Sequence, residues 1–148
     1  MVCDLTGTGF GGQYHISAYV WDDADGAPGV VLAVRSGFWI NGSAFWPATS
    51  RYVVSLTTPP CVQGKYWVGE RPEAAPEGYF EYVAADLNGP AGCPMTNIAP
   101  GQGYPSGWQD VAVRFGPTAA MGLGAQVLDC PPTPVQNSTW GRVKALIE

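Results

Sequence analysis

Charged side chains are scarce in this chain of 148 residues, because Asp, Glu, Lys and Arg together make up 13% of it, about half the share typical of a soluble domain. The seven Lys and Arg residues are scattered singly, and the formal net charge is −5. A nucleic-acid-binding surface needs clustered basic side chains that neutralise phosphates. We therefore expect no nucleic-acid partner.

Histidine is equally scarce, since His15 is the single imidazole of the chain. A serine or cysteine nucleophile needs an adjacent general base, and His15 stands between aromatic residues in a strand-like segment, which favours packing over catalysis. Paired carboxylates could hydrolyse glycosides, but Glu70, Glu73 and Glu77 fall in a proline-rich stretch and Glu81 stands alone. A hydrolase would need an acid–base pair that only folding could bring together. We therefore predict that the protein is not an enzyme.

The sequence has neither a run of about 18 apolar residues, as a membrane-spanning helix requires, nor the C-x-x-C pair of common zinc sites. We therefore expect no membrane insertion. Its four cysteines are even in number and widely dispersed, which is typical of disulfides formed in an oxidising compartment. We predict an extracellular or cell-surface protein whose export signal has been removed. Of three connectivities we favour Cys61 with Cys93 and Cys3 with Cys130, and four buried thiols are the alternative.

Glycine and proline are abundant, with 20 and 14 residues, and they interrupt the chain too often for long helices. Between them lie short segments rich in β-branched and aromatic residues, the pattern of an all-β domain. We expect an antiparallel, jelly-roll-like β-sandwich of about eight strands over residues 1–130, then a proline-rich spacer and a short C-terminal tail over residues 131–148. The expected strands are residues 14–21, 30–34, 37–40, 52–56, 65–69, 79–85, 111–115 and 124–128.

Two segments of this pattern stand out. Residues 14–21 alternate, with Tyr14, Ile16, Ala18 and Val20 on one face and His15, Ser17, Tyr19 and Trp21 on the other, and both faces are partly apolar. The carboxylate-rich residues 22–29 then lead into the next strand, which predicts a β-hairpin. Residues 86–110 hold too much glycine and proline for regular structure, so we expect a long loop that is functional or pinned by Cys93.

Oxygen ligands for a hard cation occur in the hairpin and near the long loop. Three carboxylates within four residues could bind calcium, and they are Asp22, Asp23 and Asp25. A second oxygen-rich group comprises Asp86, Asn88 and Asp110. The alternative is that these residues only form turns. Calcium is the one cofactor that the sequence suggests.

Six tryptophans and seven tyrosines are the most unusual chemical feature of the chain. Most of them are expected to fill the core. Trp46, Tyr104 and Trp108 instead stand beside proline or glycine in expected loops, where exposed rings could stack on sugars or anchor a protein interface. Both interpretations stay open at this point.

The tail and two short motifs suggest surface roles. Trp140, Val143 and Ile147 share one face if the tail is a helix capped by Ser138, while a strand over residues 143–147 could pair with a sheet edge. We expect residues 135–148 to dock on a neighbouring subunit. Asn41 and Asn137 begin N-x-S/T triplets, which are glycosylation acceptors in a host with that machinery.

Three segments resemble secreted bacterial proteins. Residues 22–32, DDADGAPGVVL, are similar to a D-x-x-G-x-P-G-x-x-L hairpin of jelly-roll β-sandwich domains, and residues 86–101 with 104–108 resemble uncharacterised extracellular proteins that share that hairpin. These resemblances span residues 14–128 and imply a fold and a location, with no assigned activity. The ending TWGRVKAL, residues 139–146, is similar to C-terminal tails of secreted proteins and implies sorting or attachment.

These observations lead to two hypotheses. The first is a non-catalytic extracellular structural subunit of a surface layer, fibre or multidomain cell-surface protein, which associates with like subunits or neighbouring domains through its tail. The alternative is a carbohydrate-binding module whose exposed aromatic side chains bind a glycan.

Overall fold

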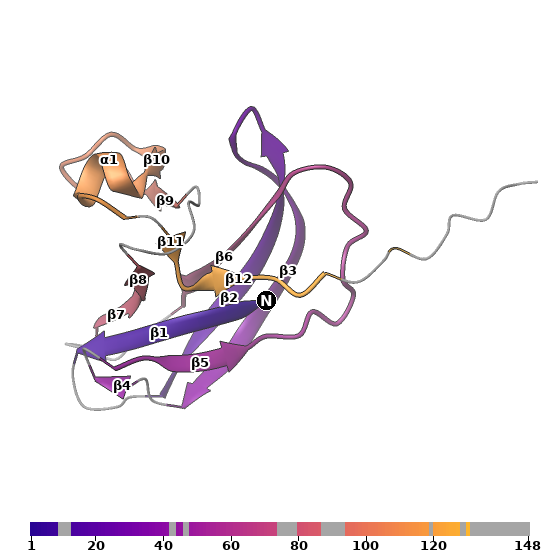
Figure 1. Cartoon of the computed structure of the whole chain (residues 1–148), viewed down its shortest axis with the longest axis horizontal. Coiled ribbons are helices and arrows are strands. Elements are labelled where there is room, and N and C mark those ends of the chain that lie inside the picture. The colour runs from indigo at the N-terminus through magenta and orange to yellow at the C-terminus, as the bar shows by residue number, and fades with distance from the viewer. Residues whose placement is uncertain are drawn as a thin grey trace, which may run out of the picture.

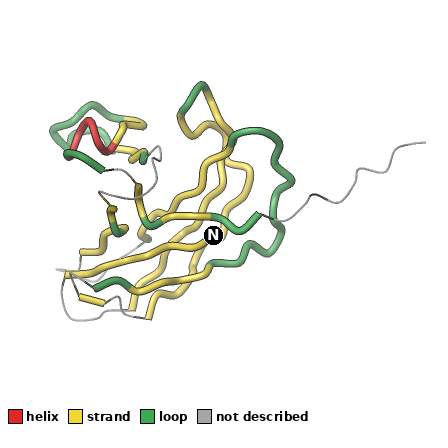
Figure 2. Tube along the Cα trace, viewed as in Figure 1, coloured by secondary structure: helices red, strands yellow, loops and turns green. Residues whose placement is uncertain are grey.

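The protein was studied as a computed structural model that describes residues 1–8, 13–41, 44–45, 48–73, 80–86, 94–118, 120–127 and 130. Within these residues the chain forms twelve strands and one helix of five residues. Figure 2 colours the strands yellow and the helix red. All strand pairs but one are antiparallel. The prediction of an all-β protein is confirmed.

The first sheet is built around β1 (Val2–Thr8), which is not among the strands predicted above. β1 pairs antiparallel with β5 (Ser50–Val53), β7 (Phe80–Val83) and β12 (Leu123–Gly124), and parallel with β4 (Ala44–Phe45). The N-terminal ammonium of Met1 also donates to the carbonyl of Val54 at 2.7 Å. Segments distant in sequence therefore converge on the first eight residues.

The second sheet has the order β3-β2-β6 and consists of β2 (Gln13–Ala24), β3 (Ala27–Asn41) and β6 (Tyr66–Pro72). The predicted hairpin is confirmed, because β2 and β3 pair antiparallel through a turn at Asp25 and Gly26. These residues have φ of 53° and 87°, the left-handed conformations that an Asp-Gly hairpin turn requires. Two predicted strands form the single long strand β3, with an irregularity near Gly37 (φ 66°).

The core draws its buried residues from both sheets, whose strands overlap in the view of Figure 1. Its buried residues come from β1, from β2 and β3, and from the start of the β5–β6 loop, and they are Cys3, Leu5, Ile16, Ala18, Ile40 and Val54. The even-numbered face of β2 is the buried one, as alternation predicts: Ile16, Ala18 and Val20 are 0%, 1% and 7% exposed. The odd-numbered face of β2 is therefore directed away from the core.

The segment 86–110, predicted to be a structureless loop, contains a second hairpin, so that prediction is wrong for its second half. β9 (Met95–Ile98) and β10 (Gly107–Asp110) pair antiparallel around a turn-rich connection. Two further short strands, β8 (Ala85–Asp86) and β11 (Ala120–Met121), pair with each other. The pairing of β9 with β10 supplies the backbone hydrogen bonds that local composition did not indicate.

The strand predicted over residues 111–115 is also wrong, because these residues form the helix α1 (Val111–Phe115). Asp110 caps it, since its Oδ1 accepts hydrogen bonds from the backbone of Ala112 at 2.7 Å and of Val113 at 3.2 Å. An N-cap carboxylate satisfies the unpaired amide groups of a first helical turn. The cap outweighs the β-propensity of the valines.

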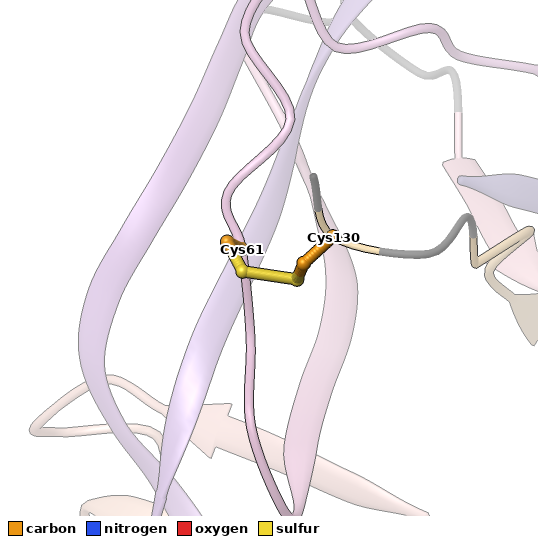
Figure 3. Close-up of a disulfide and its surroundings, with 2 residues drawn as sticks. All are labelled: Cys61 and Cys130. Atoms are coloured by element: carbon orange, nitrogen blue, oxygen red, sulfur yellow. A yellow bond between two sulfur atoms is a disulfide. The ribbon is translucent and has the colours of Figure 1, made fainter. Parts of the chain in front are cut away.

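Cys61 and Cys130 form a disulfide with a Cα–Cα distance of 5.6 Å (Figure 3). Both favoured pairings are therefore wrong. The loop between β5 and β6 carries Cys61 past the segment that follows β12, whereas Cys3 is buried in the core on β1. Cys93 lies outside the described residues, as does the predicted spacer and tail 131–148 with Asn137, Trp140, Val143 and Ile147.

Candidate functional site: an aromatic groove

The site begins with two rings on the outer face of β2. Tyr19 and Trp21 are two residues apart on one strand, so their side chains share the face opposite the core. Their rings stack with centroids 5.1 Å apart and planes 14° from parallel. Both residues are half-buried, which leaves part of each ring accessible.

Gly69 on β6 makes room for the indole of Trp21. It lies opposite Tyr19 in the β2–β6 register, and a Cβ at this position would lie 2.9 Å from Cζ3 of Trp21. Real Cβ atoms essentially never approach other heavy atoms so closely, so glycine at this position allows the Trp21 ring to lie where it does. The glycine therefore sets the position of Trp21.

Trp67 and Asp23 continue this surface toward the hairpin turn. Trp67 lies opposite Trp21 in the β2–β6 register, and its indole Nε1 donates to Oδ1 of Asp23 at 2.8 Å. The other oxygen of Asp23 accepts from the backbone of Gly26 at 3.2 Å. One carboxylate thus fixes both the turn and the Trp67 ring.

Trp108 approaches from the second hairpin. Its ring meets that of Trp21 edge to face, with centroids 5.4 Å apart and an interplanar angle of 81°, a favoured aromatic geometry. Asn97 on β9 lies directly opposite Trp108 and is exposed. The β9–β10 hairpin therefore adds both an aromatic ring and an amide to the surface formed by β2 and β6.

Together these residues line the aromatic groove, a term used below for the surface of Tyr19, Trp21, Trp67 and Trp108. The groove follows β6, has a volume of about 1340 Å³ and is also lined by residues of β9, β10, β11 and β12. It exceeds the roughly 300–1,000 Å³ of a drug-sized pocket, so it suits an extended ligand. Polar side chains on its border include Asp23, Lys65, Arg71, Thr96 and Asn97.

Of the three aromatic residues predicted to bind a ligand, Trp108 lines the groove. Tyr104 is 48% exposed, but its ring contacts that of Phe115 at 5.3 Å, and it is not part of the groove lining. Trp46 lies outside the described residues. Sequence reasoning missed Tyr19, Trp21 and Trp67 as residues of the groove, although the partly apolar odd-numbered face of β2 was the signal that could have found the first two.

The predicted calcium ligands serve the hairpin. The backbone amide of Val30 donates to Oδ1 of Asp22, Asp23 holds Gly26 and Trp67, and Asp25 forms the turn. Among the residues that the structure describes, no group of three or more His, Cys, Asp or Glu side chains is placed to hold a metal ion. In the second oxygen-rich group Asp110 caps α1, and Asn88 lies outside the described residues.

Two carboxyl groups near the end of β6 have opposite electrostatic environments. Glu70 lies opposite Ala18 on the core-facing side, its Oε2 is enclosed without a hydrogen-bond partner, and burial raises its pKa to about 7. The pKa of Glu73 is lowered, first by the hydroxyl of Ser17 and then by the amide of Gly37, which donates at 2.9 Å. Because Ala18 and Ser17 point to opposite faces of β2, these two carboxyls do not form an acid–base pair.

Comparisons with protein-family models, with curated proteins and with solved structures found no match to this chain. In the part of the chain that the structure describes, no helix is long and apolar enough to cross a membrane. The functional proposal therefore rests on the chemistry of the groove itself.

Proposed function

We propose that this chain is a non-catalytic carbohydrate-binding module, in which the aromatic groove binds a glycan. The observation that carries the proposal is that Tyr19, Trp21 and Trp108 meet ring to ring along one open groove. Aromatic faces present an apolar plane that excludes water, and sugars offer apolar C–H faces surrounded by hydroxyls. A row of such rings therefore suits successive sugar units of one chain.

The polar border of the groove supports the same ligand class. Amide, hydroxyl and carboxylate groups of Asn97, Thr96 and Asp23 can bond hydroxyls as donors or acceptors. The charged residues on the border include both signs, because Asp23 lies there together with Lys65 and Arg71. This balance favours a neutral glycan over a phosphorylated or strongly acidic ligand.

A glycan array followed by calorimetric titration of the best glycan tests this proposal. We expect Trp108→Ala to weaken binding at least about tenfold, which corresponds to about 1.4 kcal/mol. Tyr104→Ala is the matched control, because Tyr104 is an exposed aromatic residue outside the groove, and it is expected to bind like the parent. An array without signal, or equal affinity for the Trp108→Ala variant, contradicts the proposal.

A second function, that of a self-associating extracellular structural subunit, is favoured by a different observation. β3 carries exposed apolar residues at Val30, Val31, Leu32 and Val34, and contiguous exposed apolar surface commonly marks an interaction site. In this proposal residues 135–148 dock on a neighbouring subunit. Light scattering of the chain with and without these residues tests the role of the tail, and unchanged assembly without them contradicts it.

We also propose that the fold is a jelly-roll-like sandwich and that the protein is extracellular. The jelly-roll-like sandwich is supported by a core cluster that draws buried residues from both the β1 sheet and the β3-β2-β6 sheet. An extracellular location is supported by the Cys61–Cys130 disulfide, since such bonds persist in oxidising compartments.

A further inference from the structure

Trp39 lies on the same face of the β3-β2-β6 sheet as the aromatic groove, but it is not part of the groove lining. It pairs with His15 in the β2–β3 register, and the two rings are in contact, with centroids 3.8 Å apart. His15 belongs to the odd-numbered face of β2, which also carries Tyr19. The neighbours of Trp39 along β3, Phe38 and Ile40, belong to the core instead. The indole of Trp39 is therefore directed to the outer face of the sheet.

The side chain of Trp39 is 51% exposed, whereas tryptophan is on average highly buried in folded proteins. Covering this ring would remove apolar surface from water. Trp39 and His15 are called the second aromatic platform below. They offer a ligand an exposed indole face in a position that β2 and β3 determine.

Polar groups lie between the second aromatic platform and the groove. Arg71 on β6 is opposite Ser17, and both Arg71 and Glu73 are exposed. The hydroxyl of Ser17 and the amide of Gly37 donate to Oε1 of Glu73, and the backbone amide of Glu73 donates to the carbonyl of His15 at 2.8 Å. Carboxylate and guanidinium groups can bond sugar hydroxyls as acceptor and donor. The outer face thus has aromatic rings at both ends and polar side chains between them.

The spacing of the two sets of rings sets the size of a ligand that contacts both. β2 pairs with β6 without a register shift from Ile16 to Asp22, and Figure 1 shows β2 and β3 running side by side. Tyr19 and His15 are four residues apart, about 13 Å at the rise of a β-strand. One sugar ring cannot contact both residues, so only a chain of linked sugars can lie in the groove and reach the second aromatic platform.

We propose that the second aromatic platform extends the glycan-binding site along β2, so that the ligand is a linear, extended and neutral glycan. This proposal rests on the proposed carbohydrate-binding function and names the class of glycan. A short ligand in the groove leaves Trp39 exposed, whereas a longer chain covers Trp39 and places its hydroxyls beside Arg71 and Glu73. Because both contact regions then bind one molecule, affinity rises with the length of the ligand.

Titration calorimetry with linear β-linked oligosaccharides of glucose, mannose, xylose and N-acetylglucosamine tests the proposal, each sugar being used as its trisaccharide and its hexasaccharide. We expect at least one hexasaccharide to bind at least about tenfold more tightly than its trisaccharide. Trp39→Ala should remove this gain and keep the parental affinity for the trisaccharide, whereas Trp39→Phe, which retains an aromatic ring, should keep part of the gain. Tyr104→Ala is the matched control, because Tyr104 is an exposed aromatic residue elsewhere, and it should bind both lengths like the parent.

The outcomes separate the extended site from the proposed function. A gain with length that survives Trp39→Ala, or no gain in any of the four series, overturns the second aromatic platform, and weaker binding of Trp108→Ala to both lengths still supports the groove. Binding only to short or branched glycans of an array also overturns the extension alone. No binding to any glycan overturns both proposals.

Hydroxyl-radical footprinting of the parent chain gives a readout that needs no variant. The hexasaccharide should protect both Trp39 and Trp108 from oxidation, and the trisaccharide should protect Trp108 alone. Equal oxidation of Trp39 with and without the hexasaccharide contradicts the extended site.

Discussion

The indole of Trp67 donates to the carboxylate of Asp23 at 2.8 Å, and this contact joins the β2–β3 hairpin to β6. The same carboxylate accepts from Gly26 in the turn. Asp23, for which the sequence left calcium binding and turn formation both open, therefore positions one ring of the aromatic groove. A residue that bonds a turn amide and an indole couples the stability of the hairpin to the shape of the groove.

Removing this carboxylate should affect both properties. Asp23→Ala leaves the Trp67 Nε1 and the Gly26 amide without their acceptor, which should cost about 1–3 kcal/mol of folding stability and weaken glycan binding several-fold. Asp23→Asn keeps one acceptor oxygen, so its folding stability and glycan affinity should lie between those of the parent and of Asp23→Ala. Urea unfolding and titration calorimetry measure the effects. Parental values for both properties in Asp23→Ala would show that the contact has no role.

A substitution at Gly69 tests whether the position of the Trp21 ring matters for the aromatic groove. Gly69→Ala places a methyl group 2.9 Å from the Trp21 ring, so the indole must move away from β6. We expect a loss of about 1–3 kcal/mol in stability and clearly weaker glycan binding. Gly124→Ala is the matched control, because a Cβ there meets no heavy atom within 4 Å. The account is contradicted if both variants bind and unfold alike.

The buried carboxyl of Glu70 should make folding stability depend on pH. Burial raises its pKa to about 7 from 4.5, so its contribution to stability is fully present below about pH 4.5 and is lost as pH rises through 7. The difference corresponds to about 3 kcal/mol. Glu70→Gln should remove this loss, and urea unfolding at several pH values between about 4 and 8 measures it. An unchanged loss of stability between about pH 4.5 and 7 in the Gln variant contradicts the assignment to Glu70.

Glu73 serves as the contrasting case in the same experiment. Its lowered pKa, caused mainly by the Ser17 and Gly37 hydrogen bonds, gives stability that is present above the unfolded pKa and is lost as pH falls. Glu73→Gln should therefore weaken the loss of stability below about pH 4.5 and leave the loss between about pH 4.5 and 7 unchanged.

The disulfide should contribute through the unfolded chain. Cys61 and Cys130 are 69 residues apart, and a cross-link over a loop of this length restricts the unfolded ensemble, with typical stabilisation of about 2–4 kcal/mol. Replacing both cysteines with serine should lower the free energy of unfolding by this amount without changing glycan affinity. Unfolding in denaturant and titration of the same sample measure both quantities.

Local sequence patterns predicted the parts of the fold that local chemistry determines. The Asp25-Gly26 turn, the hairpin and the buried face formed by Ile16, Ala18 and Val20 follow from left-handed turn residues and strand alternation. In contrast, β1 is a short segment with which four other strands pair, and its Cys3 and Leu5 are buried by packing against core residues distant in sequence. Its role depends on contacts that no local pattern encodes.

The candidate site, too, was predicted from sequence only in part. Trp108 was identified from its position beside glycine, yet its neighbour Trp21 comes from a strand 87 positions earlier, and their contact depends on how the two hairpins are placed. The cysteine pairing failed for the same reason, since spacing along the chain does not reveal which loops lie together. The α1 helix was missed because the cap at Asp110 outweighs the β-propensity of Val111 and Val113.

The most direct test of the central claim is the affinity of the parent chain and of Trp108→Ala for the glycan that gives the strongest array signal, measured by titration calorimetry beside Tyr104→Ala. The account predicts that the parent and Tyr104→Ala bind alike and that Trp108→Ala binds at least about tenfold more weakly. Equal affinity of all three chains, or loss of binding in Tyr104→Ala instead, would contradict glycan binding in the aromatic groove.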